Sequence, residues 1–450
     1  MSQQTNDAAL PAGPTQHPMM QTLRWFYRPI SFMEDCRRRY GEAFSVKFTG
    51  FQTPLVMFSD PAAVKAVYTE RENGLPPGRN LVLEPLLGTR SVLLLEGEEH
   101  LSRRKLMLPS FHGERMRAYQ EVMEEVARRE VDSWPLASEF AIHPRMQAAT
   151  LEVILRAVFG VTDPARLDRL RDRLRRMLHL TAAPALQLLG FATRPLGERG
   201  PYGRFERLRG EVDTELFAEI AERRRDPAVA DREDILAALV GARFEDGEPM
   251  SDQEVRDQLM TLLLAGHETT ATALAWAFDL LLRHPAALRR LREELAGGED
   301  GAYLRATITE ALRLRPVVPI AGRRLAHDLE VDGLRLPAGT DLSPAIWLTH
   351  TRPDLYPEPY AFRPERFLEE GPETYGWIPF GGGVRRCLGA AFAEFEMRVV
   401  LREVLTRCEL RSADPSPERV GRRNVTFSPK NGTRVLVERR SEATAKGEKR

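Results

Sequence analysis

One cysteine, Cys387, lies in a loop that could bring a thiolate against a flat ligand. The loop Phe380–Gly389 reads FGGGVRRCLG, with four glycines, two arginines directly before the cysteine and helix-forming residues after it. Glycine adopts positive φ angles and has no side chain, so its backbone can approach a ligand closely. A thiolate can ligate iron, and thiolate ligation of haem iron favours O–O bond cleavage. The alternative is a structural cysteine in a glycine-rich turn, because cysteine is often buried.

A second set of reactive residues lies within a long apolar segment. Ser251 and Glu254 have the spacing of a capping box, which predicts that a helix begins there. Helix-forming residues continue to His284, and Pro285 follows. At 1.5 Å per residue this helix would be about 50 Å long. Residues 259–282 are apolar on nearly every side, which indicates burial.

An acid and an alcohol stand at the centre of this predicted helix. Residues 265–270 read AGHETT and place Glu268 and Thr269 side by side after Gly266. A charged carboxylate disfavours a membrane span here. Glycine weakens a helix, and a threonine hydroxyl can bond back to a carbonyl group and bend it, so we expect a local opening. Without the cysteine loop the segment would be more typical of a core; with it, an acid–alcohol pair that relays protons is favoured.

The composition excludes several classes of function. The chain has 450 residues, is 42% hydrophobic and 29% charged, and has 65 basic and 65 acidic residues. The balance gives no electrostatic reason to expect binding to nucleic acid or to an anionic membrane. The three cysteines are too few for a disulfide framework or a four-cysteine iron–sulfur cluster. This low count suits a reducing cytoplasm.

The ends of the chain differ in character from its middle. Residues 1–20 are polar, contain prolines and lack the pattern of a signal peptide or a membrane anchor, so we expect an extended lead-in. Residues 441–450 are polar and are predicted to be a disordered tail. No repeat or linker separates these ends, so residues 21–440 are expected to form one domain. Leu329–Leu336 and Val425–Leu436 each have the pattern of two strands joined by a turn.

The two reactive segments resemble motifs of the cytochrome P450 family. The spacing Phe-x-x-Gly-x-Arg-x-Cys-x-Gly within Phe380–Gly389 is similar to the haem-binding loop of that family, and residues 265–270 resemble its oxygen-activation segment. The resemblance extends over residues 20–437. It implies a mainly α fold with small β-sheets and a long central helix over the haem. It also implies that Cys387 is the axial ligand of haem b (iron protoporphyrin IX).

The resemblance assigns roles to further residues. Glu268 and Thr269 would be catalytic, because in the family such a pair helps to deliver the protons needed for O–O cleavage. Glu310, Arg313 and Arg366 match a buried charged triad with a structural role. Glu-x-x-Arg alone is a weak motif, since most such pairs are exposed and contribute little. Buried ion networks must be complete, so loss of one partner should cost on the order of 3–5 kcal/mol.

Haem carries two propionate groups that need basic partners. His100 and Arg104 lie four residues apart, on one face of a predicted helix, and resemble the propionate-binding pair of the family. Arg323 and Arg385 match two further propionate contacts. Taken singly, each of these bases would more often be solvated. The other haem-contacting positions that the resemblance implies are Ala265, Phe380, Gly381 and Gly389.

The activity implied by the resemblance is that of a haem-thiolate monooxygenase, which inserts one atom of O2 into a substrate. Only about 60 residues follow the cysteine loop, too few for a typical flavin domain, so electrons should come from a separate partner. We expect a ferredoxin with its NAD(P)H-dependent ferredoxin reductase, attracted by Arg103, Lys105 and Arg386. A monomer without a membrane anchor is expected.

The substrate is predicted only as a class. The pocket is expected to include the segments Leu83–Leu95 and Leu178–Leu189, which are mostly apolar and would favour a fatty acid, a terpenoid or a similar secondary metabolite. These segments could equally belong to the core. The single residues expected in the pocket are Val317, Val318, Ile320, Val425 and Thr426.

Two other functions remain compatible with these residues. The first is a haem-thiolate enzyme that uses a peroxide, although such relatives often lack the acid–alcohol pair. The second is a haem sensor without catalytic activity, in which an oxygen-activation segment would have no role. Turnover with reduced ferredoxin would separate a monooxygenase from a sensor.

Overall fold

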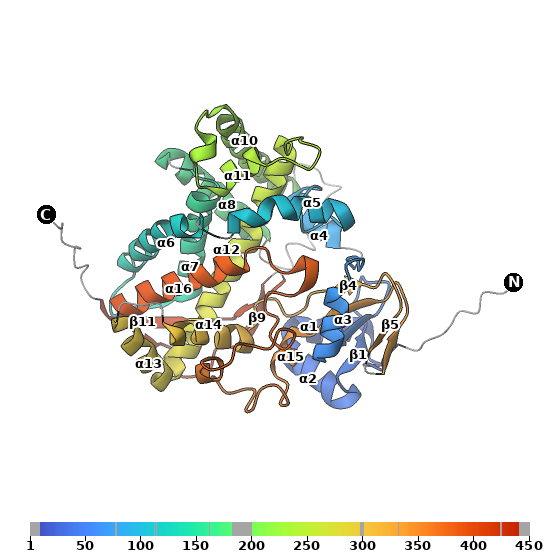
Figure 1. The fold of residues 1–450 in the computed structure, drawn as a ribbon. Helices are drawn as coiled ribbons and strands as arrows, with labels where there is room; N and C mark the ends of the chain where they lie inside the picture. Colours follow the sequence, from blue (N-terminus) through green and yellow to red (C-terminus); the bar gives the residue numbers. More distant parts are fainter. Residues whose placement is uncertain are drawn as a thin grey trace. The chain divides into compact units, whose positions relative to one another are not determined.

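The fold is mainly α-helical with small β-sheets, as expected (Figure 1). The computed structural model describes residues 10–76, 79–111, 113, 115–161, 163–181, 200–297, 301–331, 333–423 and 425–440. The predicted tail and residues 1–9 of the lead-in lie outside the described residues. The first helix begins at Pro18, inside the expected lead-in.

The chain forms two compact units. The sheet unit comprises Met1–Arg103, Arg313–Ala361 and Gly371–Leu388, and the helical unit comprises Arg104–Leu312, Phe362–Glu370 and Gly389–Arg450. Two helices, α5 (Gly97–Met107) and α14 (Ala302–Leu314), contribute residues to both units. One domain over residues 21–440 stays a prediction.

The sheet unit is built around a four-stranded sheet with the order β1-β2-β7-β4. Strand β2 pairs antiparallel with β1 and parallel with β7, and β4 pairs antiparallel with β7. The strands of the unit are β1 (Ala43–Val46), β2 (Leu55–Phe58), β4 (Arg323–Arg324), β5 (Leu329–Val331), β6 (Leu334–Leu336) and β7 (Asp341–Pro344). Its helices are α1 (Pro18–Tyr27), α2 (Pro29–Tyr40), α3 (Pro61–Thr69), α4 (Arg79–Leu87) and α15 (Ile346–His350).

An apolar cluster packs α3 against this sheet. Val56, Phe58 and Leu342 of the sheet pack with Val64 of α3 in one apolar cluster. Helix α3 begins at Pro61, after Asp60, whose carboxylate accepts hydrogen bonds from two backbone N–H groups of the first turn. The predicted hairpin over Leu329–Leu336 is confirmed, because β5 and β6 pair antiparallel in that interval.

The helical unit contains the long helix that the sequence predicts. Its helices are α6 (Arg115–Asp132), α7 (Ile142–Val153), α8 (Pro164–Thr181), α10 (Pro201–Arg225), α11 (Ile235–Gly241), α12 (Asp252–Arg283), α13 (Pro285–Ala296) and α16 (Ala390–Arg407). A π-helical turn, Ile154–Val158, continues α7. The 3-10 helices are Leu108–Phe111, Val229–Asp231 and Pro364–Phe367 in this unit and Gly383–Arg385 in the sheet unit.

Helix α12 has the ends that the sequence predicts. The N–H of Glu254 donates to the Ser251 hydroxyl at 3.2 Å, and the N–H of Ser251 donates to the Glu254 carboxylate at 2.9 Å, which confirms the capping box. The helix ends at Arg283, one residue before His284 and two before Pro285. Helices α7 and α16 lie beside it (Figure 1). In the part of the chain that the structure describes, no helix is both long and apolar enough to cross a membrane.

The strands of the helical unit differ from the prediction near the C-terminus. They are β3 (Glu139–Ala141), β8 (Cys408–Ser412), β9 (Val420–Arg423), β10 (Thr426–Pro429) and β11 (Arg434–Arg440). Within the interval Val425–Leu436, β10 does not pair with β11: β10 pairs with β9, and β11 pairs with β3 and β8. The predicted strand pair was therefore wrong. Gly432 and Thr433 have positive φ angles and redirect the chain, and the partners of β11 lie far away in sequence.

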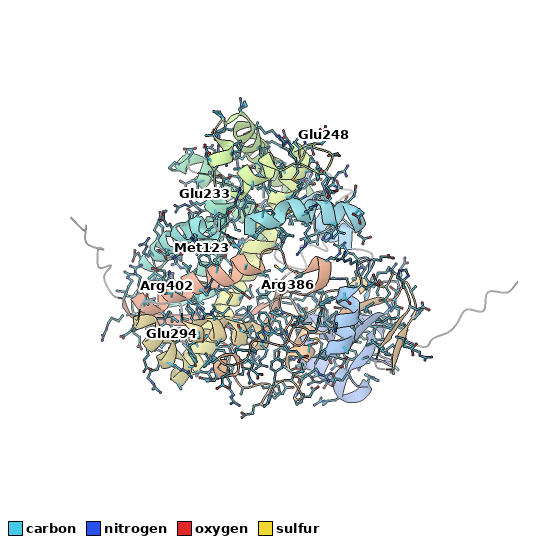
Figure 2. The ribbon with its side chains drawn as sticks, in the orientation of Figure 1. Met123, Glu233, Glu248, Glu294, Arg386 and Arg402 are labelled. Carbon is cyan, nitrogen blue, oxygen red and sulfur yellow. The ribbon has the colours of Figure 1, made fainter. Side chains whose placement is uncertain are left out.

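Helix α16 packs along α6 and carries both a partly buried ion pair and a buried acid. Arg402 of α16 pairs with Glu124 of α6 at 2.7 Å, and the neighbouring Met123 is fully buried. Figure 2 labels Arg402 and Met123 on these two helices. Glu396 of α16 is 1% exposed, and its Oε1 atom forms no hydrogen bond with the described residues. Burial raises the pKa of Glu396 to about 8. The carboxyl group is therefore protonated in the folded protein at neutral pH.

Because of Glu396, the free energy of unfolding should fall as the pH rises. An unfolded chain ionises this carboxyl group near its ordinary pKa of 4.5, whereas the folded protein keeps the proton up to about pH 8. The unfolded state therefore loses its proton first, and the cost reaches on the order of 3 kcal/mol at pH 7. Chemical unfolding from pH 4.5 to 8 should show a flatter profile for Glu396→Gln than for the wild type. The exposed Glu121→Gln should keep the wild-type slope, and an equal slope for Glu396→Gln would refute the assignment.

Candidate active site

The cysteine loop of the sheet unit is closed by its own backbone. The N–H of Cys387 donates to the carbonyl of Phe380 at 2.8 Å, and the Cys387 side chain is exposed. Gly383 has a φ of 64°, and a Cβ atom there would overlap the Tyr68 carbonyl of α3. Glycine is therefore required both for the turn and for the close approach of the loop to α3. The loop therefore leaves the Cys387 thiol exposed.

Basic side chains of the same unit lie in buried or partly buried positions. His100 of α5 is 4% exposed, and the Arg385 guanidinium donates to the Leu95 carbonyl at 2.7 Å. His100 and Arg385 both line a hollow of about 410 Å³. Arg104, which follows one turn later on α5 and belongs to the helical unit, is half-buried. The other residues that line the hollow are Arg71, Glu72, Asn73, Gly74, Glu96, Gly97, Leu101 and Val384.

Arg323, the first residue of β4, is buried and has no counter-ion among the described residues. It is 7% exposed, and its guanidinium lies over the Tyr68 ring, 5.2 Å from the ring centroid. It donates to the Gly322 carbonyl at 2.9 Å, and it forms no ion pair with the residues that the structure describes. Burial lowers the pKa of Arg323 because the charge loses its hydration. Such a cation is stabilised by a bound anion.

These residues of the sheet unit fit a haem group. An exposed thiol is a ligand for iron. The buried Arg323, together with Arg385, provides the positive charge that two propionates require, and His100 adds a ring N–H that can donate a hydrogen bond. The fit depends on these side chains and on the charge of Arg323, for which the described residues provide no counter-ion.

The predicted acid–alcohol segment lies on α12 in the helical unit. Helix α12 is continuous through Gly266, and the Thr269 hydroxyl donates to the carbonyl of Ala265, one turn earlier. The back-bond occurs as expected, but the expected opening of the helix does not. A Cβ atom on Gly266 would lie 3.0 Å from the Ile154 side chain, so the glycine allows close packing against the end of α7.

Glu268 points to side chains from two other elements. Its Oε2 atom accepts a hydrogen bond from the Gln147 amide of α7 at 2.6 Å. Its Oε1 atom lies 3.7 Å from Nε2 of His143 and 3.4 Å from Nε of Arg423, at the end of β9. Burial raises the pKa of Glu268, and Arg423, Gln147 and Thr272 act against this shift. The Glu268 side chain is 14% exposed.

Two buried histidines adjoin this carboxyl group. His143 lies 3.1 Å from the Thr272 hydroxyl, and Nδ1 of His267 lies 3.4 Å from the Thr150 hydroxyl. Burial lowers the pKa of His143 to about 3 and that of His267 to about 4. Both histidines are therefore neutral near pH 7. The sequence analysis did not identify His143, Gln147 or Arg423. His143 and Gln147 lie four residues apart on one face of α7, and this spacing was the available signal for them.

The predicted charged triad is divided between the two units. In the helical unit Glu310 is fully buried and accepts from Nε of Arg366 at 3.2 Å and from the N–H of Arg363 at 2.9 Å. In the sheet unit Arg313 is fully buried, with its guanidinium 4.8 Å from the centre of the Tyr356 ring. The Arg313 guanidinium donates to three backbone carbonyls, those of His350, Pro359 and Ala361.

The residues predicted for the substrate pocket lie in both units. In the sheet unit Val317 is buried, and Val318 and Ile320 are partly buried. In the helical unit Thr426 is 2% exposed, whereas Val425 is 56% exposed. Residues 182–189 of the predicted segment Leu178–Leu189 lie outside the described residues. The pocket stays a prediction.

Two of the residues predicted to attract a redox partner lie on the surface of their units. Arg386 is exposed in the cysteine loop (Figure 2). Lys105 is also exposed, but its ammonium group pairs with Glu245 at 2.7 Å within the helical unit. An exposed pair of this kind contributes little to stability and can exchange partners.

Comparisons with known proteins agree with these features. A profile of the cytochrome P450 family matches residues 11–434. Putative cytochrome P450 135B1 of Mycobacterium tuberculosis is 42% identical over 455 residues, which cover 98% of this chain and 96% of the relative. Putative cytochrome P450 137 of the same species is 41% identical over 399 residues, covering 88% of this chain and 83% of the relative.

Solved structures show the same architecture. Retinoic acid-bound cyanobacterial CYP120A1 superposes with a TM-score of 0.80 at 27% identity, covering 95% of this chain and 98% of that one. The cytochrome P450DA haem domain gives a TM-score of 0.82 at 22% identity, covering 96% and 98% of the two chains. The match over residues 11–434 and the identity to full-length relatives place this chain in the cytochrome P450 family.

Proposed function

We propose that this protein is a haem-thiolate monooxygenase that inserts one atom of O2 into a lipophilic substrate. Membership of the cytochrome P450 family supports monooxygenase chemistry in general. The observation that carries the proposal is the exposed Cys387 thiol, held by a closed glycine loop in the same unit as the buried Arg323, which has no counter-ion in the described part of the chain. Haem b, when bound, supplies the activation of O2. The protein itself supplies the ligand, the orientation and the protons.

Each group of residues has one task in this proposal. Cys387 ligates the iron as a thiolate. His100, Arg104, Arg323 and Arg385 hold the propionates, and Glu310, Arg313 and Arg366 maintain the fold. The positions proposed to contact the porphyrin are Ala265, Phe380, Gly381 and Gly389.

Thr269 and Glu268 are proposed to supply the protons. The Thr269 hydroxyl can donate to oxygen, and Glu268 can take up a proton from solvent and pass it on. Burial favours the protonated form of Glu268, and Arg423 favours the ionised form. Because burial and Arg423 act in opposite directions, the Glu268 carboxyl group is suited to take up and release a proton in each turnover.

The substrate is proposed to be a fatty acid, a terpenoid or a similar apolar metabolite. CYP120A1, 27% identical to this chain, was solved with retinoic acid, a terpenoid acid. Val317, Val318, Ile320, Val425 and Thr426 are proposed to line the pocket. Retinoic acid and dodecanoic acid are suitable probes, and a shift of the haem Soret band on titration would report their binding.

Electrons are proposed to come from a separate ferredoxin and its NAD(P)H-dependent reductase. The exposed Arg386 and Lys105, with Arg103, are candidates for attracting an acidic ferredoxin. We further propose that the protein works as a monomer in the cytoplasm. Turnover with a ferredoxin pair would support the monooxygenase; product with added peroxide alone would favour the peroxide-using alternative, and haem binding without product would favour the sensor.

Thr269→Ala should keep its haem but should no longer couple the oxidation of NADPH to product formation. The variant loses a proton donor, and general acid catalysis contributes about 10²–10⁴-fold, so reducing equivalents should go mainly to hydrogen peroxide. The measurement is peroxide released per NADPH oxidised in the presence of a ferredoxin pair. Thr214→Ala removes the same kind of back-bonded hydroxyl from an exposed position on α10 and is the matched control. Equal coupling in the two variants would exclude the role of Thr269.

A further inference from the structure

Arg423 occupies a fixed position beside α12. It is the last residue of β9 and pairs with Thr426 of β10. The indole N–H of Trp276, on α12, donates to the carbonyl of Phe427 at 2.8 Å, which attaches this hairpin to the helix. The Thr426 hydroxyl donates to the Arg423 carbonyl at 2.7 Å, which fixes the backbone of Arg423 itself. The hairpin thus holds the Arg423 side chain near the centre of α12.

Helix α7 holds the other side of the same carboxyl group. Gln147 binds Oε2 of Glu268, and the Thr150 hydroxyl, three residues further along α7, donates to the His267 carbonyl at 3.0 Å. His143, one turn before Gln147, bonds with Thr272 on α12. These contacts attach α7 to α12 on both sides of Glu268. The Glu268 side chain therefore lies between a fixed helix and a fixed hairpin.

The contact between Glu268 and Arg423 is close but is not a formed hydrogen bond. Oε1 of Glu268 and Nε of Arg423 are 3.4 Å apart. Both atoms are buried, and neither forms a hydrogen bond with the described residues. A small rotation would form a charge-assisted bond between them. The Arg423 side chain is 31% exposed and that of Glu268 is 14% exposed, so Arg423 is the more solvent-accessible member of this contact.

We propose that Arg423 is a positioning residue that holds the Glu268 carboxyl group toward the partly exposed Arg423 side chain, where Glu268 takes up protons. Gln147 fixes the second carboxyl oxygen, so that Oε1 faces Arg423. This inference rests on the proposed function, because it concerns the supply of protons to the same reaction. It adds a role for residues of α7 and β9 to that of the acid–alcohol pair.

The charges around Glu268 agree with this role. The groups that face it are Gln147 and His143 from α7, Arg423 from β9, and Thr272 from α12 itself. His143 and His267 are neutral near pH 7, because burial lowers their pKa values to about 3 and about 4. Among the described residues, Arg423 is the one whose charge acts on the pKa of Glu268, and it lowers that pKa. Loss of Arg423 should therefore raise the pKa of Glu268.

The first test follows Glu268 directly by infrared spectroscopy of the haem-loaded protein over a pH series. The carboxyl C=O band of Glu268 is identified as the band that Glu268→Gln removes. In Arg423→Met the midpoint of this band should move to higher pH, and Arg423→Lys should lie closer to the wild type. Arg419→Met, an exposed arginine one residue before β9, is the matched control and should not move it.

The second test measures coupling in the same variants, with dodecanoic acid as the probe and a ferredoxin pair. The peroxide released per NADPH should rise about threefold or more in Arg423→Met. Gln147→Leu should also raise the peroxide released per NADPH. Arg423→Lys should keep this ratio close to that of the wild type. A fold defect alone would lower the haem content without moving the Glu268 midpoint.

Two results would overturn the inference. One is an unchanged midpoint of the Glu268 band in Arg423→Met. The other is a midpoint that moves equally in Arg419→Met. Failure of the proposed function would look different, because the wild-type protein would then lack the carbon monoxide spectrum of a haem thiolate, whatever the midpoint of Glu268.

Discussion

Cys387→Ser is expected to abolish both the thiolate spectrum and turnover. A serine hydroxyl is not ionised at neutral pH and cannot replace a thiolate as a strong donor to iron. The reduced carbon monoxide complex should lose its strongly red-shifted Soret band, and turnover with a ferredoxin pair should fall to background. The change is chemical rather than structural, because the loop is closed by backbone hydrogen bonds and the Cys387 side chain is exposed.

The other two cysteines provide the controls. Cys36 and Cys408 are buried, and burial raises the pKa of each thiol to about 11. Both thiols are therefore protonated at neutral pH and are poor ligands. Cys36→Ala and Cys408→Ala should keep the red-shifted band. Loss of that band in either variant, or its persistence in Cys387→Ser, would contradict the ligand assignment.

Glu310→Gln should lower the free energy of unfolding by about 3–5 kcal/mol. Glu310 is fully buried and the Arg366 side chain is only 10% exposed, so the change leaves a guanidinium charge without its counter-ion. Glutamine can still accept the hydrogen bond from the Arg363 N–H, so the loss of stability measures the effect of removing the charge of Glu310. The measurement is urea unfolding of the purified protein at neutral pH.

An exposed ion pair gives the matched comparison for Glu310. Glu330 and Arg335 pair at 2.6 Å on the β5–β6 hairpin, where their side chains are 65% and 73% exposed. Exposed pairs contribute about 0–1 kcal/mol, so Glu330→Gln should change the free energy of unfolding by less than that. Equal effects of the two substitutions would show that the buried position of Glu310 does not matter.

Local patterns in the sequence predicted the features that depend on neighbouring residues. The capping box at Ser251 and Glu254 and the proline after His284 were enough to place both ends of α12 within a residue. The Asp-Gly turn identified the β5–β6 hairpin because its two strands are adjacent in the chain. The glycines before Cys387 indicated a tight loop, and two of them, Gly381 and Gly383, have positive φ angles.

Features that depend on distant residues could not be predicted in this way. Strand β11 pairs with β3 and β8, whose positions no local pattern reveals, so the strand pair expected near Val425 was wrong. The surroundings of Glu268 come from residues more than 100 positions away, such as His143 and Arg423. Helix α12 also stays closed at Gly266, because that glycine accommodates Ile154 rather than opening the helix.

The most direct test of the account is the carbon monoxide difference spectrum of the wild-type protein after reduction with dithionite. We predict a strongly red-shifted Soret band, which shows that a thiolate ligates the haem iron. A band at the position of histidine-ligated haem would contradict ligation by the Cys387 thiolate, and the absence of any haem band would contradict haem binding altogether.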